Sequence, residues 1–266
     1  MELIISPDRD FVQEPLQVFS FGGGVQSTAM LHLIADGLLE RPDIAIFADT
    51  GSELPETLEH IEKNVIPYCE QIGLPFEIVK SPRGKLHDDY LKNKAIPMIG
   101  IRSCTVVFKI MPQRRRVREI VGKKNGVLIA QSWLGITQDE ERRRTESDVK
   151  WMGIRYPLLD DLPMTRDDCI KINEDRGFQP VKSGCFCCPY AGKKTYMELK
   201  AKHPDLFDLA VKMEETAMKH LISKGKTLRT GLCSGSALSN LKGQTTLKHL
   251  IGIEDSQCDS GWNCFI

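Results

Sequence analysis

The nine cysteines of this 266-residue chain are the residues best suited to metal or redox chemistry. Cys185 and Cys188 form a Cys-x-x-Cys motif directly before Pro189. A local pair of this kind can bind zinc or an iron–sulfur cluster, or act as a redox dithiol. Cys104 and Cys169 lie upstream of the motif and could add thiolates from other segments. A structural zinc site stays open as the simpler alternative.

A run of glycines provides a second set of candidate residues, here for phosphate binding. Three glycines at 22–24 follow an apolar run at 16–21 and precede Ser27 and Thr28. The apolar run predicts a buried strand, and residues 29–35 have the apolar spacing of a helix. Glycines let backbone N–H groups approach an anion, and a helix N-terminus adds partial positive charge. The pattern indicates a phosphate-binding loop; a turn without a ligand is the alternative.

This loop resembles the PP-loop, Ser-Gly-Gly-x-Asp-Ser, of the adenine nucleotide α-hydrolase-like superfamily. That superfamily includes N-type ATP pyrophosphatases, sulfonucleotide (PAPS and APS) reductases and thiolation enzymes. Gly23, Gly24 and Ser27 match the motif, while Gly22 replaces its first Ser and Gln26 replaces its Asp. A reductase-like subgroup of phages and mobile elements, related to DNA phosphorothioation and thiolation enzymes, carries a very similar variant. The resemblance implies binding of an adenine nucleotide.

The segment Asp49-Thr50-Gly51 follows a second apolar run, at 44–48, which predicts another buried strand. Taken alone, the segment fits a polar turn before a helix equally well. Sulfonucleotide reductases carry a similar Asp-Thr-Gly followed by Pro-Glu-Thr, and the same three residues occur here at 55–57. The resemblance implies that this turn binds the adenosine side of the nucleotide.

Residues 101–124 hold eight Lys or Arg side chains and one acid, Glu119. One interpretation is a solvated basic helix. The other is a surface that contacts phosphate, either of a nucleotide or of a DNA or RNA backbone. We select Arg114, Arg115 and Arg118 as candidate contacts to such a polyanion.

A segment of mixed charge at 138–150 is either an exposed loop or the start of a helix. The reductase-like subgroup carries a similar Gly-Ile-x-x-Asp-Glu-x-x-Arg stretch after a strand. That resemblance makes Asp139, Glu140 and Arg143 further site candidates.

The resemblance also bears on the cysteines. Cluster-containing sulfonucleotide reductases use a Cys-Cys pair and, further along the chain, a Cys-x-x-Cys. Here the first pair is reduced to Cys104, so only Cys104, Cys185 and Cys188 carry over as ligands. Cys169 is the expected fourth ligand, because a helix beginning near residue 166 can present it to the motif. A three-cysteine cluster with one open iron, as in some tRNA thiolation enzymes, is the alternative.

The remaining cysteines receive weaker assignments. Cys187 is either a ligand or a spare buried thiol, and Cys69 and Cys233 are expected to be bystanders. Cys258 and Cys264 lie near the C-terminus, where sulfonucleotide reductases carry a nucleophilic cysteine. The motif that normally surrounds that nucleophile, Glu-Cys-Gly-Leu-His, is absent here. Cys264 is therefore a candidate nucleophile by position alone, and a terminal structural pair is equally consistent.

The elements that must position these residues form an alternating pattern. Further strands are predicted at 76–79, 127–130 and 133–136, and helices at 57–69, 166–176, 195–199 and 204–221. Residues 81–101 have no clear periodicity and predict a long loop, and long loops in compact domains often serve as functional lids. Strands that alternate with helices predict a parallel α/β sheet whose ligands bind at the carboxyl ends of the strands.

The composition supports a globular protein and gives no sign of a membrane protein. A hydrophobic content of 41% supports a full core, and the net charge of zero gives no global argument for nucleic acid. No apolar stretch is long enough to span a membrane, and no signal peptide is recognisable, so a cytoplasmic location is expected.

We therefore expect an α/β fold, a parallel sheet flanked by helices, with a smaller cysteine-bearing C-terminal part. The expected division is a nucleotide-binding PP-loop domain at 1–160 and a mainly helical region with a flexible tail at 161–266. The leading function is ATP-dependent, adenylating and pyrophosphate-releasing sulfur transfer to a nucleic acid (DNA or tRNA) or a nucleotide. The alternatives are a PAPS or APS reductase and a non-catalytic nucleic-acid-binding protein with structural zinc.

The resemblance implies the following cofactors and partners: ATP (or PAPS or APS), Mg²⁺, a [4Fe–4S] cluster with zinc as the alternative, and a cysteine desulfurase as sulfur donor. A homo-oligomer is compatible with the sequence. The catalytic candidates are Asp49, Lys109 and Cys264. The nucleotide-binding candidates are Ser20, Gly22, Gly23, Gly24, Gln26, Ser27, Thr28, Asp49, Thr50, Gly51 and Arg102. The metal-binding candidates are Cys104, Cys169, Cys185 and Cys188.

Overall fold

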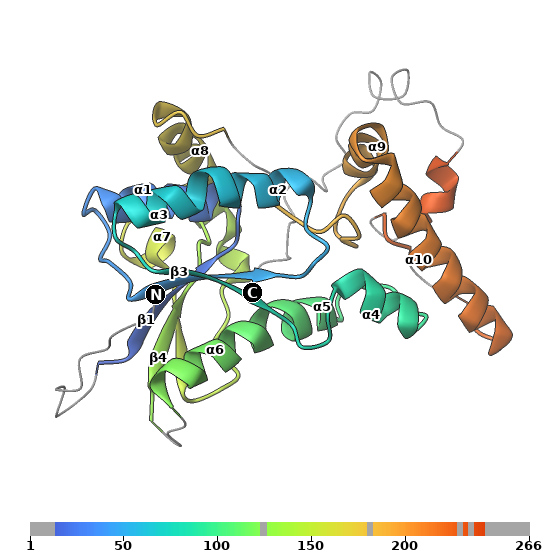
Figure 1. The fold of residues 1–266 in the computed structure, drawn as a ribbon, viewed down its shortest axis with the longest axis horizontal. Coiled ribbons are helices and arrows are strands. Elements are labelled where there is room, and N and C mark those ends of the chain that lie inside the picture. The colour runs from blue at the N-terminus through green and yellow to red at the C-terminus, as the bar shows by residue number, and fades with distance from the viewer. Residues whose placement is uncertain (1–13, 123–126, 180–182, 228–230, 234–236, 243–266) are drawn as a thin grey trace.

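Five parallel strands form the centre of the molecule (Figure 1). The computed structural model describes residues 14–122, 127–179, 183–227, 231–233 and 237–242. The strands lie in the order β3-β2-β1-β4-β5. Their bounds are β1 Leu16–Phe21, β2 Ile44–Asp49, β3 Phe76–Lys80, β4 Ala130–Trp133 and β5 Met152–Arg155. The expected parallel α/β fold is confirmed.

The two faces of the sheet are apolar because the side chains of the central strands alternate between them. Phe19 and Phe47 lie in one hydrophobic cluster with residues of the first helix. Val18 and Ile46 lie in a second cluster with Val117 of a helix on the opposite face. Burial on both faces explains why these strands read as continuous apolar runs in the sequence.

Helices that follow β1 and β2 cover one face of the sheet, together with two later helices (Figure 1). They are α1 Val25–Ala35, α2 Pro55–His60, η1 Ile61–Val65, α3 Ile66–Gln71, α7 Pro157–Asp160 and α8 Arg166–Asp175. The segment η1 is a π-helical turn between α2 and α3. Thr165 caps α8 as expected, since its hydroxyl accepts the Asp168 N–H at 3.2 Å.

A continuous helical segment covers the other face, and Figure 1 shows α6 running along the sheet. Its parts are α5 Ser103–Thr105, the π-helical turn η2 Val106–Ile110, and α6 Met111–Val121. The short helix η3 Gln138–Arg143 follows β4. Both η2 and η3 lie near the carboxyl ends of the strands, where the candidate site residues are found.

The C-terminal part is a helical unit beside the sheet (Figure 1). It contains α9 Lys193–Lys202, α10 Pro204–Ser223 and η4 Leu238–Leu241. Its core also takes in Tyr90 of α4 (Leu86–Lys92) and the four cysteines at 104, 185, 187 and 188. In the described residues, no helix is long and apolar enough to cross a membrane.

Three elements differ from the sequence-based expectation. The loop expected at 81–101 contains α4, because Leu86 and Tyr90 are buried one helical turn apart. Residues 134–136 are not a strand, and the outer strand is instead β5, at Met152–Arg155. Helix α8, expected in the C-terminal region, lies against α1 on the sheet, as their shared hydrophobic cluster shows.

A buried carboxylate in α10 fixes the last described segments of the C-terminal unit. Glu214 is 1% exposed, and its two oxygens accept the backbone N–H groups of Leu232 at 2.8 Å and Leu238 at 2.7 Å. We expect Glu214→Ala to lower the free energy of unfolding by about 3 kcal/mol, since two hydrogen bonds to a charged group are lost.

Chemical denaturation measures this loss, and Glu215→Ala is the matched control. Glu215 is the next residue, its side chain is 43% exposed, and it forms an ion pair with Lys242 at 3.2 Å. A surface pair of this kind contributes below about 1 kcal/mol. Equal stability losses in the two variants would contradict the role assigned to Glu214.

Candidate functional site

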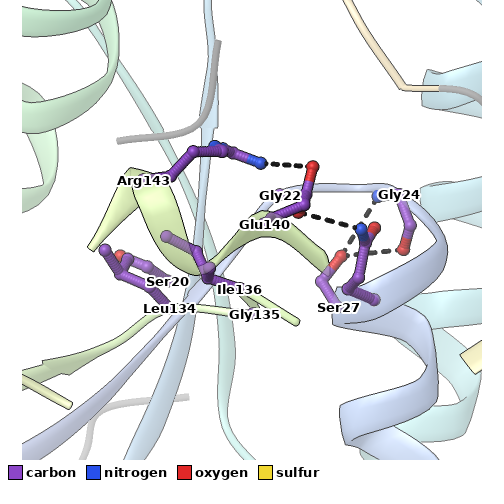
Figure 2. A pocket seen from close by; sticks show the side chains of 10 residues that line it. Ser20, Gly22, Gly24, Ser27, Leu134, Gly135, Ile136, Glu140 and Arg143 are labelled. Carbon is purple, nitrogen blue, oxygen red and sulfur yellow. Dashed lines mark hydrogen bonds and ion pairs between the residues drawn. The ribbon is translucent and has the colours of Figure 1, made fainter. Parts of the chain in front are cut away.

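A pocket lies at the carboxyl ends of β1 and β4, where the direction of the chain connections reverses. From β1 the chain passes through α1 to β2 on one side, and from β4 it passes through η3 to β5 on the other. Open α/β sheets bind ligands at such a point. The pocket, drawn in Figure 2, is lined by Ser20, Gly22, Gly24, Gln26, Ser27, Leu134, Gly135, Ile136, Glu140 and Arg143.

The glycine loop forms one side of this pocket, which we call the phosphate pocket. Gly23 has a φ of +77°, and an added Cβ would lie 3.1 Å from Thr57 Cγ2. Gly23 therefore serves the tight turn and packs inward on α2. Gly24 is the N-cap of α1 and has no side chain to accept the first N–H groups of the helix. These N–H groups can donate to an anion in the pocket.

Side-chain hydroxyl groups stabilise the glycine loop by hydrogen bonds to its backbone. Ser27 Oγ donates to the Gly24 carbonyl oxygen at 2.9 Å and accepts the Gly24 N–H at 3.1 Å. Thr28 Oγ1 donates to the same carbonyl oxygen at 3.0 Å. At the base of the pocket, Ser20 Oγ donates to Gln113 Oε1 at 2.5 Å. Ser27 and Thr28 thus stabilise the loop, while Ser20 joins β1 to α6.

An ion pair from η3 forms the opposite side of the pocket. Arg143 and Glu140 are 2.7 Å apart, and their side chains are 8% and 11% exposed. Gln26 Nε2 donates to Glu140 Oε2 at 3.2 Å, so this carboxylate links α1 to η3 (Figure 2). Asp139 lies outside the lining and accepts the Arg166 N–H at 3.0 Å. A guanidinium group held opposite a helix N-terminus suits a phosphate ligand.

The Asp49-Thr50-Gly51 turn follows β2, the neighbouring strand. Asp49 accepts the Gly51 N–H at 2.7 Å and pairs with Lys80 at 3.1 Å. Gly51 has a φ of +68°, and a Cβ there would lie 2.7 Å from Lys85 Cγ. Thr50 Oγ1 donates to Glu53 Oε1 at 3.0 Å. The turn is therefore tightly ordered at the same edge of the sheet as the phosphate pocket.

Four cysteines line a second pocket, which we call the cysteine pocket. They are Cys104, Cys185, Cys187 and Cys188, and Thr105, Lys109 and Pro189 also contribute to the lining. The Cys185 thiol donates to Glu53 Oε1 at 3.5 Å and lies 3.3 Å from Thr50 Oγ1. Lys109 Nζ lies 3.6 Å from the same Glu53 oxygen, and both side chains are buried. Glu53 was not anticipated from the sequence.

Backbone pairing holds the cysteine loop against the turn after β2. Phe186 N–H donates to the Ser52 carbonyl oxygen at 2.9 Å, and Leu54 N–H donates to the Gly184 carbonyl oxygen at 3.0 Å. Glu53 and Cys185 form an antiparallel bridge between these bonds. The Asp-Thr-Gly segment and the Cys-x-x-Cys motif are thereby brought together.

The structure places the other cysteines away from this pocket or at its margin. Cys169 lies in the core shared by α1 and α8, and burial raises the pKa of its thiol to about 12. Burial likewise raises the pKa of Cys69 to about 12. Cys233 belongs to the same hydrophobic cluster as the cysteine pocket without lining it. Cys258 and Cys264 lie outside the described residues.

The donor set of the cysteine pocket suits a thiolate-bound metal. Zinc and iron–sulfur clusters both take cysteine ligands, and four cysteines line this pocket. Among the described residues, however, no three His, Cys, Asp or Glu side chains are arranged so that they could hold a metal ion. A cluster here would require the cysteine side chains to turn toward a common centre.

The arginines of α6, the basic helix of the sequence, are paired mainly with carboxylates of the same chain. Arg114 pairs with Asp148, and Arg115 pairs with Glu119 at 3.0 Å. Arg118 stacks over Trp151 at 4.4 Å from the ring centroid. The candidate polyanion contacts therefore have partners within the chain. Arg102 lines neither of the two pockets above and belongs to a third pocket beside α5.

Comparison with known proteins gives relatives of uncharacterised function. Residues 17–155 match the family described as phosphoadenosine phosphosulfate reductase domain. Two uncharacterised proteins of Methanocaldococcus jannaschii, MJ0973 and MJ0066, are 26% and 25% identical over 71% and 80% of this chain. The match covers 45% and 44% of their lengths, so the chain spans less than half of these relatives.

Among solved structures, the chain is similar to the U34-tRNA thiolase NcsA from Methanococcus maripaludis with its [4Fe-4S] cluster. The identity is 17%, the TM-score is 0.46, and the match covers 77% of this chain and 74% of that one. The family match alone extends over more than half of the present sequence and takes in the glycine loop, the Asp-Thr-Gly turn and residues of all five strands. The chain belongs to the phosphoadenosine phosphosulfate reductase domain family.

Proposed function

We propose that this chain is an ATP-dependent sulfur-transfer enzyme that adenylates a nucleic acid or a nucleotide and releases pyrophosphate. One observation carries the proposal. The phosphate pocket and the cysteine pocket lie on one edge of the sheet, and the turn after β2 is hydrogen-bonded to the cysteine loop. Nucleotide activation and thiol chemistry can therefore act on one substrate.

The phosphates of ATP would bind between the α1 N-terminus and Arg143. The backbone N–H groups at the start of α1 would donate to them, and the helix adds partial positive charge. Arg143, oriented by Glu140, would contribute a guanidinium from the opposite side. Mg²⁺ is the cation we assign to the nucleotide, with Asp49 as its candidate carboxylate ligand.

The reaction we assign begins with attack by an acceptor oxygen on the α-phosphorus of ATP. The bond from that phosphorus to the oxygen bridging the β-phosphate breaks, and pyrophosphate leaves with the electron pair. Fixed positive charge around the phosphate stabilises the transition state. A sulfur nucleophile then attacks the carbon that bears the adenylated oxygen. The bond between that carbon and the oxygen breaks, and AMP leaves with the electron pair. Lys109, buried beside Glu53, is the candidate catalytic cation at the boundary with the cysteine pocket.

Cys104, Cys185 and Cys188 are the residues that would hold a [4Fe–4S] cluster, and Cys187 is the further cysteine in their pocket. When bound, the cluster would supply a site for the transferred sulfur. Zinc held by the same thiolates is the alternative metal. We retain Cys264 as a candidate sulfur-carrying thiol and a cysteine desulfurase as the candidate donor.

A second candidate function is reduction of PAPS or APS, and the family match at residues 17–155 favours it. In that case the phosphate pocket would hold the nucleotide part of the substrate, and a thiol would attack its sulfate sulfur. The missing Glu-Cys-Gly-Leu-His motif counts against this alternative. Release of sulfite from PAPS or APS would distinguish it from ATP-dependent transfer.

The phosphate pocket can be tested by the loss of one positive charge. Arg143→Gln keeps a polar side chain but removes the guanidinium that lies opposite the α1 N-terminus. Because the phosphates would lose a charge-assisted hydrogen-bond donor, we expect the Kd for ATP to rise about tenfold or more, as measured by isothermal titration calorimetry.

Arg142→Gln is the control for this variant, since Arg142 is the neighbouring residue, is exposed and does not line the pocket. An unchanged ATP affinity in folded Arg143→Gln protein would show that the nucleotide phosphates bind elsewhere.

The cysteine pocket can be tested by iron analysis of anaerobically purified protein. We expect Cys104→Ala, Cys185→Ala and Cys188→Ala to lose most of the iron, because each removes one thiolate from the pocket. Cys169→Ala and Cys69→Ala should retain it, since both thiols lie in the other core cluster. Iron loss in Cys169→Ala, or stoichiometric zinc in place of iron in the unmodified protein, would contradict this assignment.

A further inference from the structure

A third pocket, with a volume of about 240 Å³, lies between the helical segment α5-η2-α6 and the ends of β4 and β5. The helices contribute Arg102, Val106, Ile110 and Arg114 to its lining. The strand side contributes Ser132, Leu134 and Ile154, and the loop at 145–148 completes the lining. None of these loop residues was a site candidate from the sequence.

This third pocket lies next to both of the pockets described above. Leu134 lines it and the phosphate pocket, and Thr105 lines it and the cysteine pocket. A buried polar wall separates it from the phosphate pocket, since Ser20 Oγ donates to Gln113 at 2.5 Å and lies 3.1 Å from Ser132 Oγ. A group bound here would therefore adjoin both of those pockets.

The lining suits a flat, uncharged ring. Val106 and Ile110 lie on the helix side, and Leu134 and Ile154 lie on the strand side, so apolar side chains bound the pocket on two sides. Hydroxyl and carboxylate groups at 145–148 complete the lining and can accept or donate hydrogen bonds at the edge of such a ring. A heteroaromatic base recognised by its edge and its faces fits this combination.

The charged groups of the lining balance one another, with Arg102 and Arg114 against Glu146 and Asp148. Asp148 engages the Arg114 guanidinium through both of its oxygens, and its side chain is 76% exposed. The interaction with Arg114 lowers the pKa of Asp148, which therefore stays ionised near neutral pH. The pocket thus has no excess positive charge for a phosphate, and a ligand should insert its uncharged base and leave any phosphate at the edge.

Arg102 is the exposed cation of this lining, and its backbone is strained. Its φ is +36°, in the left-handed region that a non-glycine residue rarely adopts. Strain of this kind concentrates at functional sites. The conformation places Arg102 directly before α5, at the start of the segment that also carries Cys104.

We propose that this pocket binds the nucleoside unit that accepts sulfur. The base would enter between the two apolar sides, and the phosphate of that unit would lie near Arg102. This inference rests on the proposed function, because it names the acceptor of that reaction. The same chemistry is offered by a free nucleotide and by one residue of a single-stranded polynucleotide.

The test fills the pocket without disturbing the core. Val106 is 43% exposed and lines the pocket, so Val106→Trp places an indole in it. Met111→Trp is the matched control, because Met111 is 55% exposed on the same helical segment and does not line the pocket. Arg102→Gly is a second variant, in which glycine tolerates the positive φ and folding should be retained.

The probes are the four nucleoside 5′-monophosphates and fluorescein-labelled RNA and DNA octamers of mixed sequence, each with a saturating non-hydrolysable ATP analogue. We expect Val106→Trp to weaken probe binding at least tenfold, Arg102→Gly to weaken it severalfold, and Met111→Trp to leave it unchanged. Affinity for the ATP analogue should stay within twofold in Val106→Trp and in Met111→Trp. Binding of monophosphates would identify a free nucleotide as acceptor, and binding of octamers alone would identify a polynucleotide.

Three results would overturn the inference. The first is that no probe binds the unmodified protein. The second is that Val106→Trp and Arg102→Gly bind the probes as tightly as Met111→Trp does. The third is that Val106→Trp weakens the ATP analogue instead, which would make the pocket part of the ATP site. Failure of the unmodified protein to bind the ATP analogue would count against the proposed function. The probe titrations without the analogue would then still show whether the third pocket binds a nucleoside unit.

Discussion

The bridge between the turn after β2 and the cysteine loop is the contact on which the site depends. Two backbone hydrogen bonds join residues 52–54 to residues 184–186, and Glu53 lies between them. The Glu53 carboxylate is buried, and it is reached by Lys109, Thr50 and Cys185. Because a buried charge is costly without partners, these groups are constrained to remain together.

This contact gives the parallel sheet its functional arrangement. The carboxyl ends of parallel strands meet at one edge, so the glycine loop after β1 and the Asp-Thr-Gly turn after β2 are neighbours by topology. The bridge then adds the cysteine pocket to that edge. The segment α5-η2-α6 completes the site, since it carries Cys104 and Lys109 on one side and lines the third pocket with Arg102 and Val106 on the other.

The sequence predicted the central sheet well because its strands are buried on both faces. The runs at 16–21, 44–48 and 76–79 became β1, β2 and β3 almost residue for residue. The short strand Met152–Arg155 was missed because it contains a glycine and a charged residue and has no apolar run. Helix α4 was missed because prolines and glycines flank it, while only two of its side chains are buried.

The sequence predicted the parts of the site whose residues are close together in the chain. It did not predict the contacts between residues that only the tertiary structure brings together. Glycine spacing placed Gly24 and Ser27 at the start of α1, and local spacing placed Cys185 beside Cys188. Glu53 contacts Cys185 across 132 residues, and no local pattern indicates such a pair. Cys169 was selected because a helix beginning near residue 166 could present it to the motif, but the docking of that helix, α8, on α1 carries it into a different core.

The products formed from ATP test the central claim most directly. ATP labelled at the α-phosphate would be incubated with the anaerobically purified protein, Mg²⁺, a sulfide source and a mixture of RNA and single-stranded DNA. Chromatography would then separate AMP, ADP and ATP, and pyrophosphate would be assayed in parallel. The account predicts AMP and pyrophosphate in equal amounts, formed only when nucleic acid or nucleotide acceptor is present. Formation of ADP and phosphate, or ATP left intact while PAPS or APS is reduced to sulfite, would contradict it.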